Sequence, residues 1–352
     1  MDFDPKSAFQ SREVSYSYQG EEFADPRILV VGCGDAGCRM VTRLSNLGVS
    51  GAETLAVNTD QRWMGEIKAD GKILIGRGVV VGDGAGGDPE VGRIAAKRSE
   101  RALLEALGRR DLVFVAAGLG GGTGAGAAPL ICRMAKDLGA TAVGIFTLPL
   151  ASVFQEGVEG ATIDIEDLVK ATNTSIILDN NKILEMAPDL SAEQTFSVMD
   201  QVVAEIIKGI VETITQTSLI NLDYADVRTI MADGGLSAVL VGEADSGEGA
   251  EVVVLSALRS PMLEVETKAA TGCLLHITGG EDLTLKKAAE IAGALTRELD
   301  ERANVIWGAR VKAGRGGRIG LLAIMTGVGT PRDPGRSEAL SSCGGLRTAS
   351  RS

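Results

Sequence analysis

A glycine run at residues 118–126 constrains this chain more than any other feature, and it reads Gly-Leu-Gly-Gly-Gly-Thr-Gly-Ala-Gly. An apolar, strand-like segment precedes it at residues 112–117, and a helix-like stretch follows at about residues 127–138. Glycine lets the backbone turn tightly and approach a ligand with no Cβ in the way. A strand, a glycine turn and a helix N-terminus together direct several N–H groups and a positive dipole end at one point. The run therefore predicts an anion site, most often a site for phosphate.

This run is not a Walker A loop, because that motif ends in Gly-Lys-Ser/Thr and no lysine follows these glycines before Lys136. An earlier glycine turn, residues 32–37, follows the first predicted strand and reads Gly-Cys-Gly-Asp-Ala-Gly. Its GxGxxG pattern fits an NAD-binding unit as well as a GTPase, and Asp60 lies where a Rossmann enzyme would place its ribose-binding acid. At this turn a nicotinamide-dependent oxidoreductase remains an alternative.

A third glycine-rich turn, residues 82–89, adds to the evidence and reads Gly-Asp-Gly-Ala-Gly-Gly-Asp-Pro. Three such turns at strand ends can wrap a triphosphate with backbone N–H groups, and that arrangement needs no lysine. No candidate proton relay for an oxidoreductase follows the early glycine turn. The three turns therefore favour a nucleoside triphosphate over a nicotinamide cofactor.

The composition argues against several classes of protein. With 352 residues, 45% of them hydrophobic and 23% charged, the chain fits a soluble globular protein with two domains. A net charge of −12 and the lack of any Lys/Arg cluster argue against binding to nucleic acid and against adhesion to anionic lipid. No apolar run is long enough to span a bilayer, and residues 1–25 lack the apolar core of a signal peptide. We expect no direct membrane insertion and a cytoplasmic location.

Cysteine and histidine usage argues against metal and thiol chemistry. The five cysteines are scattered and form no Cys-x-x-Cys pair, so we expect reduced thiols rather than a disulfide framework or a structural zinc site. The one histidine, His276, lies in an apolar segment. We expect it to be a hydrogen-bonded residue of a strand rather than a catalytic group.

The alternation of apolar strands and helices from residue 27 predicts an α/β fold with a mostly parallel sheet covered on both faces. Strands are predicted at 27–32, 52–58, 72–76, 111–117, 141–148 and 174–179, and the helices between them at 37–47, 89–107 and 127–138. A long helix follows at 192–215, with a capping box at its start and an apolar stripe wide enough to be buried between two domains. A smaller α+β domain is then predicted from strands at 238–242, 273–278, 304–309 and 319–325 and from helices at 251–258 and 283–299.

These residues resemble the tubulin and FtsZ superfamily of polymerising GTPases, whose signature is the GGGTGAG within the long glycine run. Further segments match that family in order and spacing, namely Asn58-Thr59-Asp60, the Ala-Gly-Gly-Asp-Pro turn at 85–89, Asn221 to Val227, Ala270 to Gly272, and Ile306 to Ala309. The resemblance covers roughly residues 27–328, and the segment at 281–285 looks closest to archaeal FtsZ. It implies a Rossmann-like parallel-sheet GTPase domain, a long central helix and a smaller α+β C-terminal domain.

From the pattern and the resemblance together we expect five parts. They are a disordered N-terminal arm over residues 1–25, a GTP-binding domain over 26–190, a central helix over 191–220, a C-terminal domain over 221–329 and a disordered tail over 330–352.

The resemblance also implies a site for GTP or GDP with Mg²⁺. The sequence does not identify a side chain that binds the metal. Phe196 would stack on the base and Asp200 would recognise guanine. They lie four apart on one helix and so share a face, and a carboxylate can accept two N–H bonds from guanine that adenine cannot offer. Taken alone, Phe196 would be a core residue and Asp200 a surface charge. The full set of expected nucleotide-binding residues is Gly34, Asp35, Ala36, Asn58, Gly86, Gly87, Gly120, Gly121, Gly122, Thr123, Gly124, Phe196 and Asp200.

Asn221, Asp223 and Asp226 are the expected catalytic residues. In isolation, two acids in a loop indicate a solvated turn or a helix cap. In the superfamily, however, the matching loop is inserted into the nucleotide pocket of the next subunit, where its Asn and two Asp position and polarise the attacking water. The resemblance thus implies head-to-tail protofilaments, GTP hydrolysis at the subunit interface and assembly of a division ring. Family members often dock membrane adaptor proteins through the C-terminal tail.

Three features depart from the family pattern. The family usually has Gly at Asp35 and Asn at Cys38, and the Glu-Gly pair and Arg that contact ribose and phosphate are replaced by Val153, Phe154 and Gly157 on ungapped alignment. These changes predict weaker GTP binding or slower turnover. They also leave an alternative, in which the chain is a divergent paralogue that binds GTP and polymerises but serves a shape or scaffold role.

Overall fold

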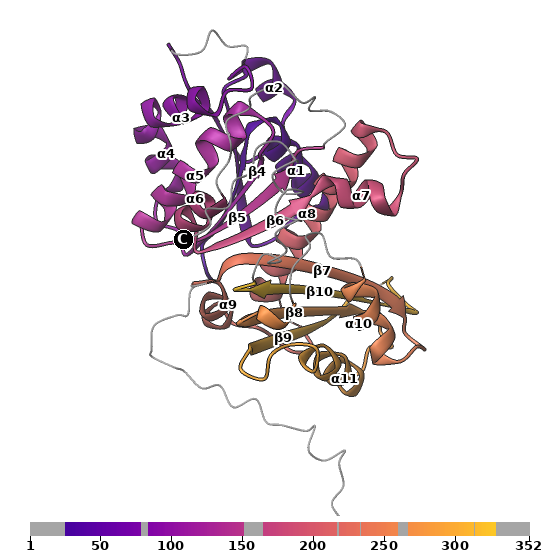
Figure 1. Cartoon of the computed structure of the whole chain (residues 1–352). Coiled ribbons are helices and arrows are strands. Elements are labelled where there is room, and N and C mark those ends of the chain that lie inside the picture. The colour runs from indigo at the N-terminus through magenta and orange to yellow at the C-terminus, as the bar shows by residue number, and fades with distance from the viewer. Residues whose placement is uncertain are drawn as a thin grey trace, which may run out of the picture.

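The computed structural model describes residues 25–78, 84–150, 165–216, 218–232, 234–259, 267–312 and 314–328 (Figure 1). The predicted arm (apart from its last residue) and the predicted tail lie outside the described residues. The departures at Val153, Phe154 and Gly157 lie outside them as well. Among the helices that are described, none is long and apolar enough to cross a bilayer.

Six parallel strands form the N-terminal part of the sheet. Their order is β3-β2-β1-β4-β5-β6, and the bounds are β1 (Ile28–Cys33), β2 (Ala52–Asn58), β3 (Gly71–Leu74), β4 (Leu112–Gly118), β5 (Thr141–Leu148) and β6 (Thr174–Asp179). The central strands are continuous apolar runs because helices cover both faces. In β1, Leu29 and Val31 face one helical layer, whereas Ile28 and Val30 face the other.

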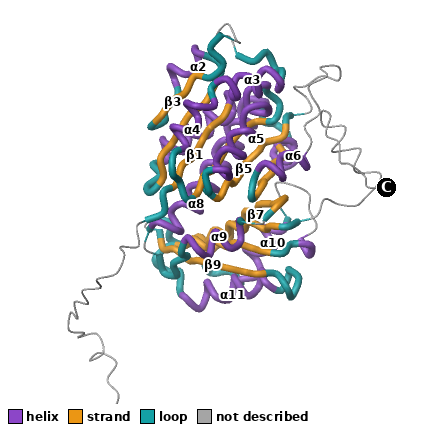
Figure 2. Tube along the Cα trace, turned by 90° about the vertical axis from the view of Figure 1, so that its left-hand side faces the viewer, coloured by secondary structure: helices purple, strands orange, loops and turns teal. Residues whose placement is uncertain are grey.

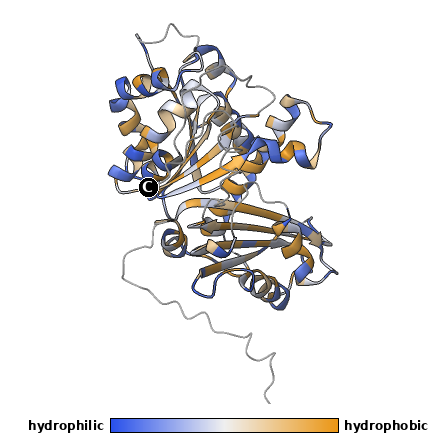
Figure 3. Ribbon diagram, viewed as in Figure 1, coloured by the Kyte–Doolittle hydropathy of each residue, from blue (hydrophilic) through white to orange (hydrophobic). Residues whose placement is uncertain are grey.

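The helices divide between these two faces. One face packs on α3 (Pro89–Arg98), α4 (Glu100–Leu107), α5 (Gly122–Asp137) and α6 (Ile165–Ala171). The opposite face packs on α1 (Gly34–Leu47), α7 (Asn180–Met186), α8 (Ala192–Thr215) and α9 (Tyr224–Met231). The short α2 (Gln61–Glu66) lies between β2 and β3 in the chain. Figure 3 shows apolar residues gathered on the strands and on the helix faces that meet them.

The C-terminal strands extend the same sheet in the order β7-β10-β8-β9. They are β7 (Gly235–Asp245), β8 (Gly272–Gly279), β9 (Asn304–Val311) and β10 (Arg318–Thr326); β10 runs antiparallel to both of its neighbours, and β8 and β9 are parallel. Two helices, α10 (Ala250–Leu258) and α11 (Leu285–Thr296), pack on one face, and a 3₁₀ turn spans Thr267–Ala269. The two parts join where β6 pairs with β7 over three residues, so the predicted α+β part continues the parallel sheet.

The helix α8 connects the two parts, as the wide apolar stripe predicted. Its bounds and its capping box match the prediction: Ser191 Oγ accepts from the amide of Gln194 at 3.2 Å, and Gln194 Oε1 accepts from the amide of Ser191 at 2.8 Å. Val203 and Ile207 belong to a single core that also contains Leu274 of β8. Figure 2 shows α8 at the level where the upper and lower strands meet.

Two predicted helices differ from the structure more than the others do. The helix after the long glycine run begins at Gly122 rather than near residue 127, so part of the run forms its first turns. The single helix predicted over 89–107 is broken at Ser99, whose ψ of 11° interrupts the helix. There the Ser99 hydroxyl accepts a hydrogen bond from the amide of Gly76, so a contact with a distant loop stabilises the break.

Candidate functional site

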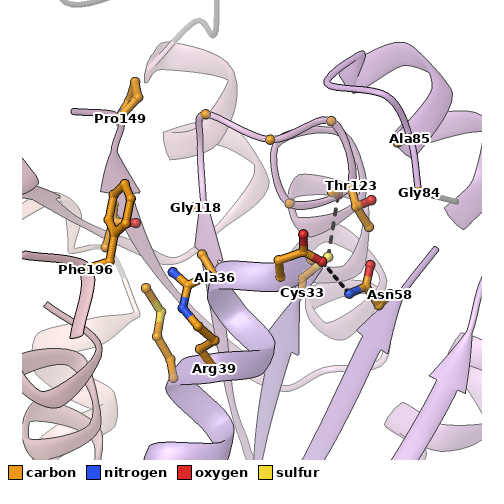
Figure 4. A pocket seen from close by; sticks show the side chains of 18 of the residues that line it. Cys33, Ala36, Arg39, Asn58, Gly84, Ala85, Gly118, Thr123, Pro149 and Phe196 are labelled. Atoms are coloured by element: carbon orange, nitrogen blue, oxygen red, sulfur yellow. Dashed lines mark hydrogen bonds between the residues drawn. The ribbon is translucent and has the colours of Figure 1, made fainter. Parts of the chain in front are cut away.

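A cavity of about 320 Å³ lies beyond the carboxyl ends of four parallel strands (Figure 4). Cys33 ends β1, Asn58 ends β2, Gly118 ends β4 and Leu148 ends β5, and all four residues line the cavity. This edge of an open α/β sheet is the usual place for a ligand, because the helix N-termini meet there. The sheet therefore places the cavity where the glycine turns were predicted to converge.

The structure brings all the predicted nucleotide-binding residues to this one cavity. Two of them come from α8, and the others come from the three glycine turns and from the end of β2. The residues in the lining are Gly34, Asp35, Ala36, Asn58, Gly86, Gly87, Gly120, Gly121, Gly122, Thr123, Gly124, Phe196 and Asp200.

Two helices present uncapped N-termini to the cavity. Cys33 precedes α1 and Gly121 precedes α5, and no side chain of an N-cap residue bonds to the first amides of either helix. By contrast, α2, α3, α7, α8, α9 and α11 are capped by the side chain of the residue before the helix, and the uncapped α4 and α10 do not line the cavity. The first-turn N–H groups of α1 and α5 can therefore bind an anion, and the helix dipoles favour negative charge at that point.

Close backbone packing explains why two of these positions are glycines. Gly34 has a φ of +71°, and a Cβ there would lie 2.8 Å from the amide nitrogen of Gly124. A Cβ on Gly124 would lie 2.6 Å from the carbonyl oxygen of Gly118. The turns before α1 and α5 therefore touch each other directly. A Cβ on Gly121 would meet nothing within 4 Å, so that part of the loop is open.

Polar side chains connect the loops beneath the cavity. The hydroxyls of Thr59 and Thr123 lie 2.6 Å apart, which ties the end of β2 to the start of α5. Asn58 is buried; its Oδ1 accepts from the amide of Thr59 at 2.7 Å, and its Nδ2 donates to Asp35 Oδ1 at 2.8 Å. The acid that replaces the expected glycine is thus exposed in the cavity and is held by Asn58.

The second departure, Cys38, does not face the cavity. Its thiol is buried and donates to the carbonyls of Gly32 at 3.6 Å and Val57 at 3.7 Å. Burial raises the pKa of this thiol to about 12. In the described part of the chain the cysteines are free thiols.

The other end of the cavity is formed by α8 and α1. Asp200 is buried, and Arg39 Nε donates to its Oδ2 at 2.9 Å. The guanidinium of Arg39 also lies 5.7 Å from the centre of the Phe196 ring. Figure 4 shows Arg39 and Phe196 on the same side of the cavity. Burial raises the pKa of the Asp200 carboxyl above its ordinary value, and the charge of Arg39 opposes that rise.

Sequence reasoning missed several cavity residues, of which Arg39 and Asn180 are two with polar side chains. Arg39 lies four residues after Asp35 on α1, a spacing that places both on one helix face and could have indicated its role. Asn180 begins α7, and its Nδ2 donates to the carbonyl of Leu148 at 2.5 Å. The buried Oδ1 of Asn180 has no hydrogen-bond partner in the described structure. This oxygen is therefore an acceptor that a ligand donor could satisfy.

Asn221, Asp223 and Asp226 are absent from the lining of this cavity, as far as the described residues define it. Asp223 Oδ1 accepts from the amide of Asp226 at 2.8 Å, and Asp226 Oδ2 accepts from the amide of Asp223 at 3.3 Å, so the two acids form a capping box on α9. Asn221 Oδ1 accepts from the amide of Ser218 at 2.6 Å. The helix-cap alternative is therefore what the single chain adopts.

The hydrogen bonds of Tyr224 place this segment at the opposite edge of the sheet. Its hydroxyl donates to the carbonyl of Asp111 at 2.6 Å and lies 3.3 Å from the hydroxyl of Thr141. Asp111 immediately precedes β4, whose last residue, Gly118, lines the cavity. At about 3.3 Å per residue, the seven residues of β4 put roughly 20 Å between these two places.

His276 is a hydrogen-bonded strand residue, as expected. Its Nδ1 lies 2.6 Å from the hydroxyl of Thr213, and its Nε2 lies 3.0 Å from the hydroxyl of Thr278. Burial lowers the pKa of His276 to about 4. No group of three or more His, Cys, Asp or Glu side chains suited to a metal occurs within the described ranges.

Comparisons with known proteins agree with this geometry. Residues 27–188 match the model of the Tubulin/FtsZ family, GTPase domain, and residues 235–329 match that of the FtsZ family, C-terminal domain. Cell division protein FtsZ 2 of Halobacterium salinarum is 49% identical over 319 residues, which cover 91% of this chain and 81% of the relative. Cell division protein FtsZ 2 of Methanocaldococcus jannaschii is 46% identical over 329 residues, which cover 93% of this chain and 86% of the relative.

Solved structures show the same fold. A structure described as an empty FtsZ dimer of M. jannaschii has a TM-score of 0.81 at 39% identity, with 92% of this chain and 93% of that one covered. CetZ2 from Haloferax volcanii, described as a GTPgS-bound protofilament, has a TM-score of 0.74 at 21% identity, with 90% of this chain and 97% of that one covered. At this identity the match supports the fold alone. Two family models, the identity to relatives and the sheet topology lead to one conclusion: this chain belongs to the tubulin/FtsZ family of GTPases.

Proposed function

We propose that this GTPase assembles head to tail into protofilaments, that it hydrolyses GTP between subunits and that it serves division-ring assembly in the cytoplasm. One observation carries this proposal. The hydrogen bond from Tyr224 to Asp111 holds Asp223 and Asp226 at the amino edge of the sheet, whereas the cavity lies at the carboxyl edge. This separation supports a shared site, whose two halves come together when a second chain stacks on the first.

The proposed nucleotide site follows the chemistry of the cavity. The open N–H groups at the starts of α1 and α5 bind the phosphates, with Thr123 hydrogen-bonded beneath them. Phe196 stacks against the base, and the buried carboxylate of Asp200 accepts from guanine N1 and N2. The Oδ1 of Asn180, which has no partner among the described residues, is a further acceptor in the lining of the cavity. Adenine lacks the donors that Asp200 requires, so the site selects guanine.

The proposed catalytic residues act across the interface. When subunits stack head to tail, Asn221, Asp223 and Asp226 of one chain face the phosphate end of the cavity in the next. Their oxygens orient a water molecule for attack, and phosphoryl transfer depends chiefly on such positioning and on charge control. This heterologous contact does not close on itself, so it propagates into a filament. The related M. jannaschii FtsZ structure is a dimer, which supports self-association.

Mg²⁺ fits the cavity as a cofactor of the phosphates. Asp35 and Asp60 are carboxylates in its lining at the phosphate end, and Mg²⁺ typically takes one or two carboxylates together with substrate phosphates and water. If Mg²⁺ is bound here, Asp35 and Asp60 are the lining residues that would hold it together with the phosphates. When bound, Mg²⁺ neutralises phosphate charge, which also offsets the charge that Asp35 adds.

The relatives favour a division role over the alternatives. Identity is 49% to a protein named for cell division, which favours that role over a divergent paralogue with a shape or scaffold role. Membership of a GTPase family decides against the nicotinamide-dependent oxidoreductase. We further propose that the protein acts at the division site and that its tail, residues 330–352, docks a membrane adaptor protein.

Turnover measured against protein concentration tests the shared site. We expect GTP hydrolysis per subunit to rise steeply above a threshold concentration, and the same threshold should appear in the sedimented fraction. Turnover strictly proportional to protein at all concentrations would mean that each monomer holds a complete site, and the proposal would be wrong.

A further inference from the structure

Two buried threonine hydroxyls meet where the end of β2 touches the start of α5. Thr59 follows β2 directly and Thr123 is the second residue of α5; their Oγ1 atoms lie 2.6 Å apart, although the residues are 64 positions apart in the chain. Thr123 belongs to the lining of the cavity, whereas Thr59 does not. Each hydroxyl therefore has the other as its partner, but only that of Thr123 can also reach a ligand.

The direction of this hydrogen bond follows from burial. A hydroxyl has one proton to donate, so only one of the two threonines donates within the pair. Thr59 is 1% exposed, and its Oγ1 has no other hydrogen-bond partner among the described residues. If Thr59 accepted, its own proton would be buried without an acceptor, which folded proteins avoid. Thr59 therefore donates, and Thr123 accepts.

The proton of the Thr123 hydroxyl is then left for a ligand. Its Oγ1 has no second partner within the part of the chain that the structure describes. Figure 4 shows Thr123 on the same side of the cavity as Asn58. The first-turn amides of α5, which no N-cap side chain binds, lie at the same place. A phosphate oxygen at the start of α5 would supply the acceptor that this hydroxyl lacks.

Asn58 holds Thr59 in place for this donation. The amide of Thr59 donates to Asn58 Oδ1 at 2.7 Å, and Asn58 is itself buried and donates from Nδ2 to Asp35 Oδ1 at 2.8 Å. These bonds fix the backbone from which the Thr59 side chain extends. The Thr123 hydroxyl consequently has a fixed donor on one side, and its own proton points away from that donor.

We propose that Thr59 is a positioning residue of the nucleotide site: it donates to Thr123 and thereby fixes the Thr123 hydroxyl as a donor to a phosphate oxygen. This inference rests on the proposed function, because it takes the start of α5 as the phosphate site. Without Thr59, the Thr123 hydroxyl would spread over about three staggered positions, of which one suits the phosphate. Donation from Thr59 also polarises this hydroxyl and strengthens the bond that it gives.

Calorimetric titration of nucleotide-free protein with GDP tests the role of the Thr59 hydroxyl. Thr59→Val keeps the shape of the side chain and should bind GDP about fivefold more weakly than wild type, about threefold for the freed rotation and the rest for lost polarisation. Thr59→Ser keeps the hydroxyl without the methyl group and should bind GDP as wild type does. If Thr59 only fills space, this order reverses, and weaker binding by Thr59→Ser than by Thr59→Val would overturn the proposal.

Thr172→Val is the matched control. Thr172 is another buried threonine, with its Oγ1 2.7 Å from Ser175 Oγ, and it lies near the amino end of β6, outside the lining of the cavity. This variant should lose stability and still bind GDP as wild type does. An equal loss of GDP affinity in Thr172→Val and Thr59→Val would assign the effect to lost stability and overturn the proposal. Thr59→Ala, which cannot overpack the site, replaces Thr59→Val if circular dichroism shows that Thr59→Val does not fold.

A double-mutant cycle tests whether Thr59 acts through Thr123. Thr123→Val should weaken GDP binding by about tenfold, because it removes a hydrogen bond to a charged group. In that background Thr59→Val should cause no further loss, since no hydroxyl remains to be positioned. Losses that add in the double variant would mean that the two residues act independently, and the proposal would be wrong.

Guanosine, which carries base and ribose without phosphate, provides a readout that general loosening of the cavity would move. Measured by competition with GDP, its affinity should be the same in wild type and in Thr59→Val. A guanosine affinity that falls as far as the GDP affinity would contradict a role directed at phosphate.

Thr123→Val separates this inference from the proposed function. If Thr123→Val binds GDP as wild type does, the phosphate assignment at the start of α5 is wrong and the inference falls with it. If Thr123→Val loses GDP affinity while Thr59→Val does not, the phosphate site stands and only the role of Thr59 is wrong.

Discussion

Tyr224 and Asp111 lie 113 residues apart in the chain, and a hydrogen bond of 2.6 Å joins the phenol hydroxyl of one to the backbone carbonyl of the other. This contact attaches the first turn of α9 to the residue before β4. It thereby sets the position and direction of the segment that carries Asp223 and Asp226, which lies at the edge of the sheet opposite the glycine-lined cavity.

Removing that hydroxyl should loosen the segment without touching the cavity. Tyr224→Phe is expected to lower the free energy of unfolding by about 1 kcal/mol, the usual net value of one hydrogen bond. GTP binding should be unchanged, and turnover in filaments should fall because α9 is held less firmly. Urea denaturation and a GTPase assay measure the two effects. Unchanged stability and unchanged turnover would mean that the contact does not position α9.

Asp226→Ala should separate hydrolysis from assembly. The variant should bind GTP through its own glycine turns and form filaments, but its turnover should fall by roughly 10²-fold or more, because it loses the carboxylate that we propose orients the attacking water. Mixing it with wild type should reduce turnover by more than dilution does, since each mutant subunit disables a wild-type neighbour. Mixed samples that simply average the two activities would contradict a shared site.

Asp223 carries two roles that one pair of variants can distinguish. Asp223→Ala removes the N-cap of α9 and should cost about 1 kcal/mol of stability as well as activity. Asp223→Ser keeps a capping oxygen and loses the carboxylate, so it should retain stability and still lose turnover. If Asp223→Ser is fully active, Asp223 acts only as a cap.

Asp200→Ala tests base selection. The substitution removes the buried acceptor and should weaken GTP binding by about 1.5–3 kcal/mol, with a smaller preference for GTP over ATP. Competition binding with both nucleotides measures the effect, and circular dichroism checks the fold. A folded variant with wild-type affinity and selectivity would reject Asp200 as the guanine-reading residue.

Substitutions at Asp35 test whether this departure from the family pattern weakens GTP binding. Asp35→Asn keeps an oxygen that can accept from Asn58 Nδ2 and removes the charge beside the proposed phosphate site. Without divalent metal, Asp35→Asn and Asp35→Gly should bind GTP more tightly by roughly 0.5 kcal/mol, a value typical of an exposed charge pair. Calorimetry that finds equal or weaker binding in both variants would remove Asp35 as a cause of weak binding.

The lowered pKa of His276 predicts how the free energy of unfolding depends on pH. Burial lowers the pKa of His276 to about 4 from an ordinary 6.5, so the unfolded chain takes up a proton as pH falls through 6.5 while the folded chain does not. The stability that neutral His276 contributes is present above the pKa that this residue has in the unfolded chain. It is lost as pH falls toward the lower pKa that the residue has in the folded chain. We expect a loss of about 2 kcal/mol between about pH 7 and pH 5. Urea unfolding of wild type and His276→Gln measures it, and an equal loss in both would assign the effect to other groups.

The sequence predicted the elements whose signals are local. The spans of β2, β5, β6 and α8 match the predicted residues, because hydrophobic period and the capping box at Ser191 act over a few neighbouring positions. The glycine turns likewise predicted that the cavity would lie at the carboxyl edge of the sheet, because that edge is where strand, turn and helix N-terminus meet. The unpredicted helices α2, α6, α7 and α9 are short, so each offers too few turns for a clear period.

Only the tertiary structure decided which distant residues meet. Arg39 and Asp200 are 161 residues apart, and nothing in their local spacing indicates that they pair. The break at Ser99, the continuation of the parallel sheet into β7 and the attachment of Tyr224 to Asp111 likewise depend on partners far along the chain. Local signals follow from backbone geometry and neighbouring side chains. Contacts of this kind instead depend on how whole layers pack, which no short stretch of sequence specifies.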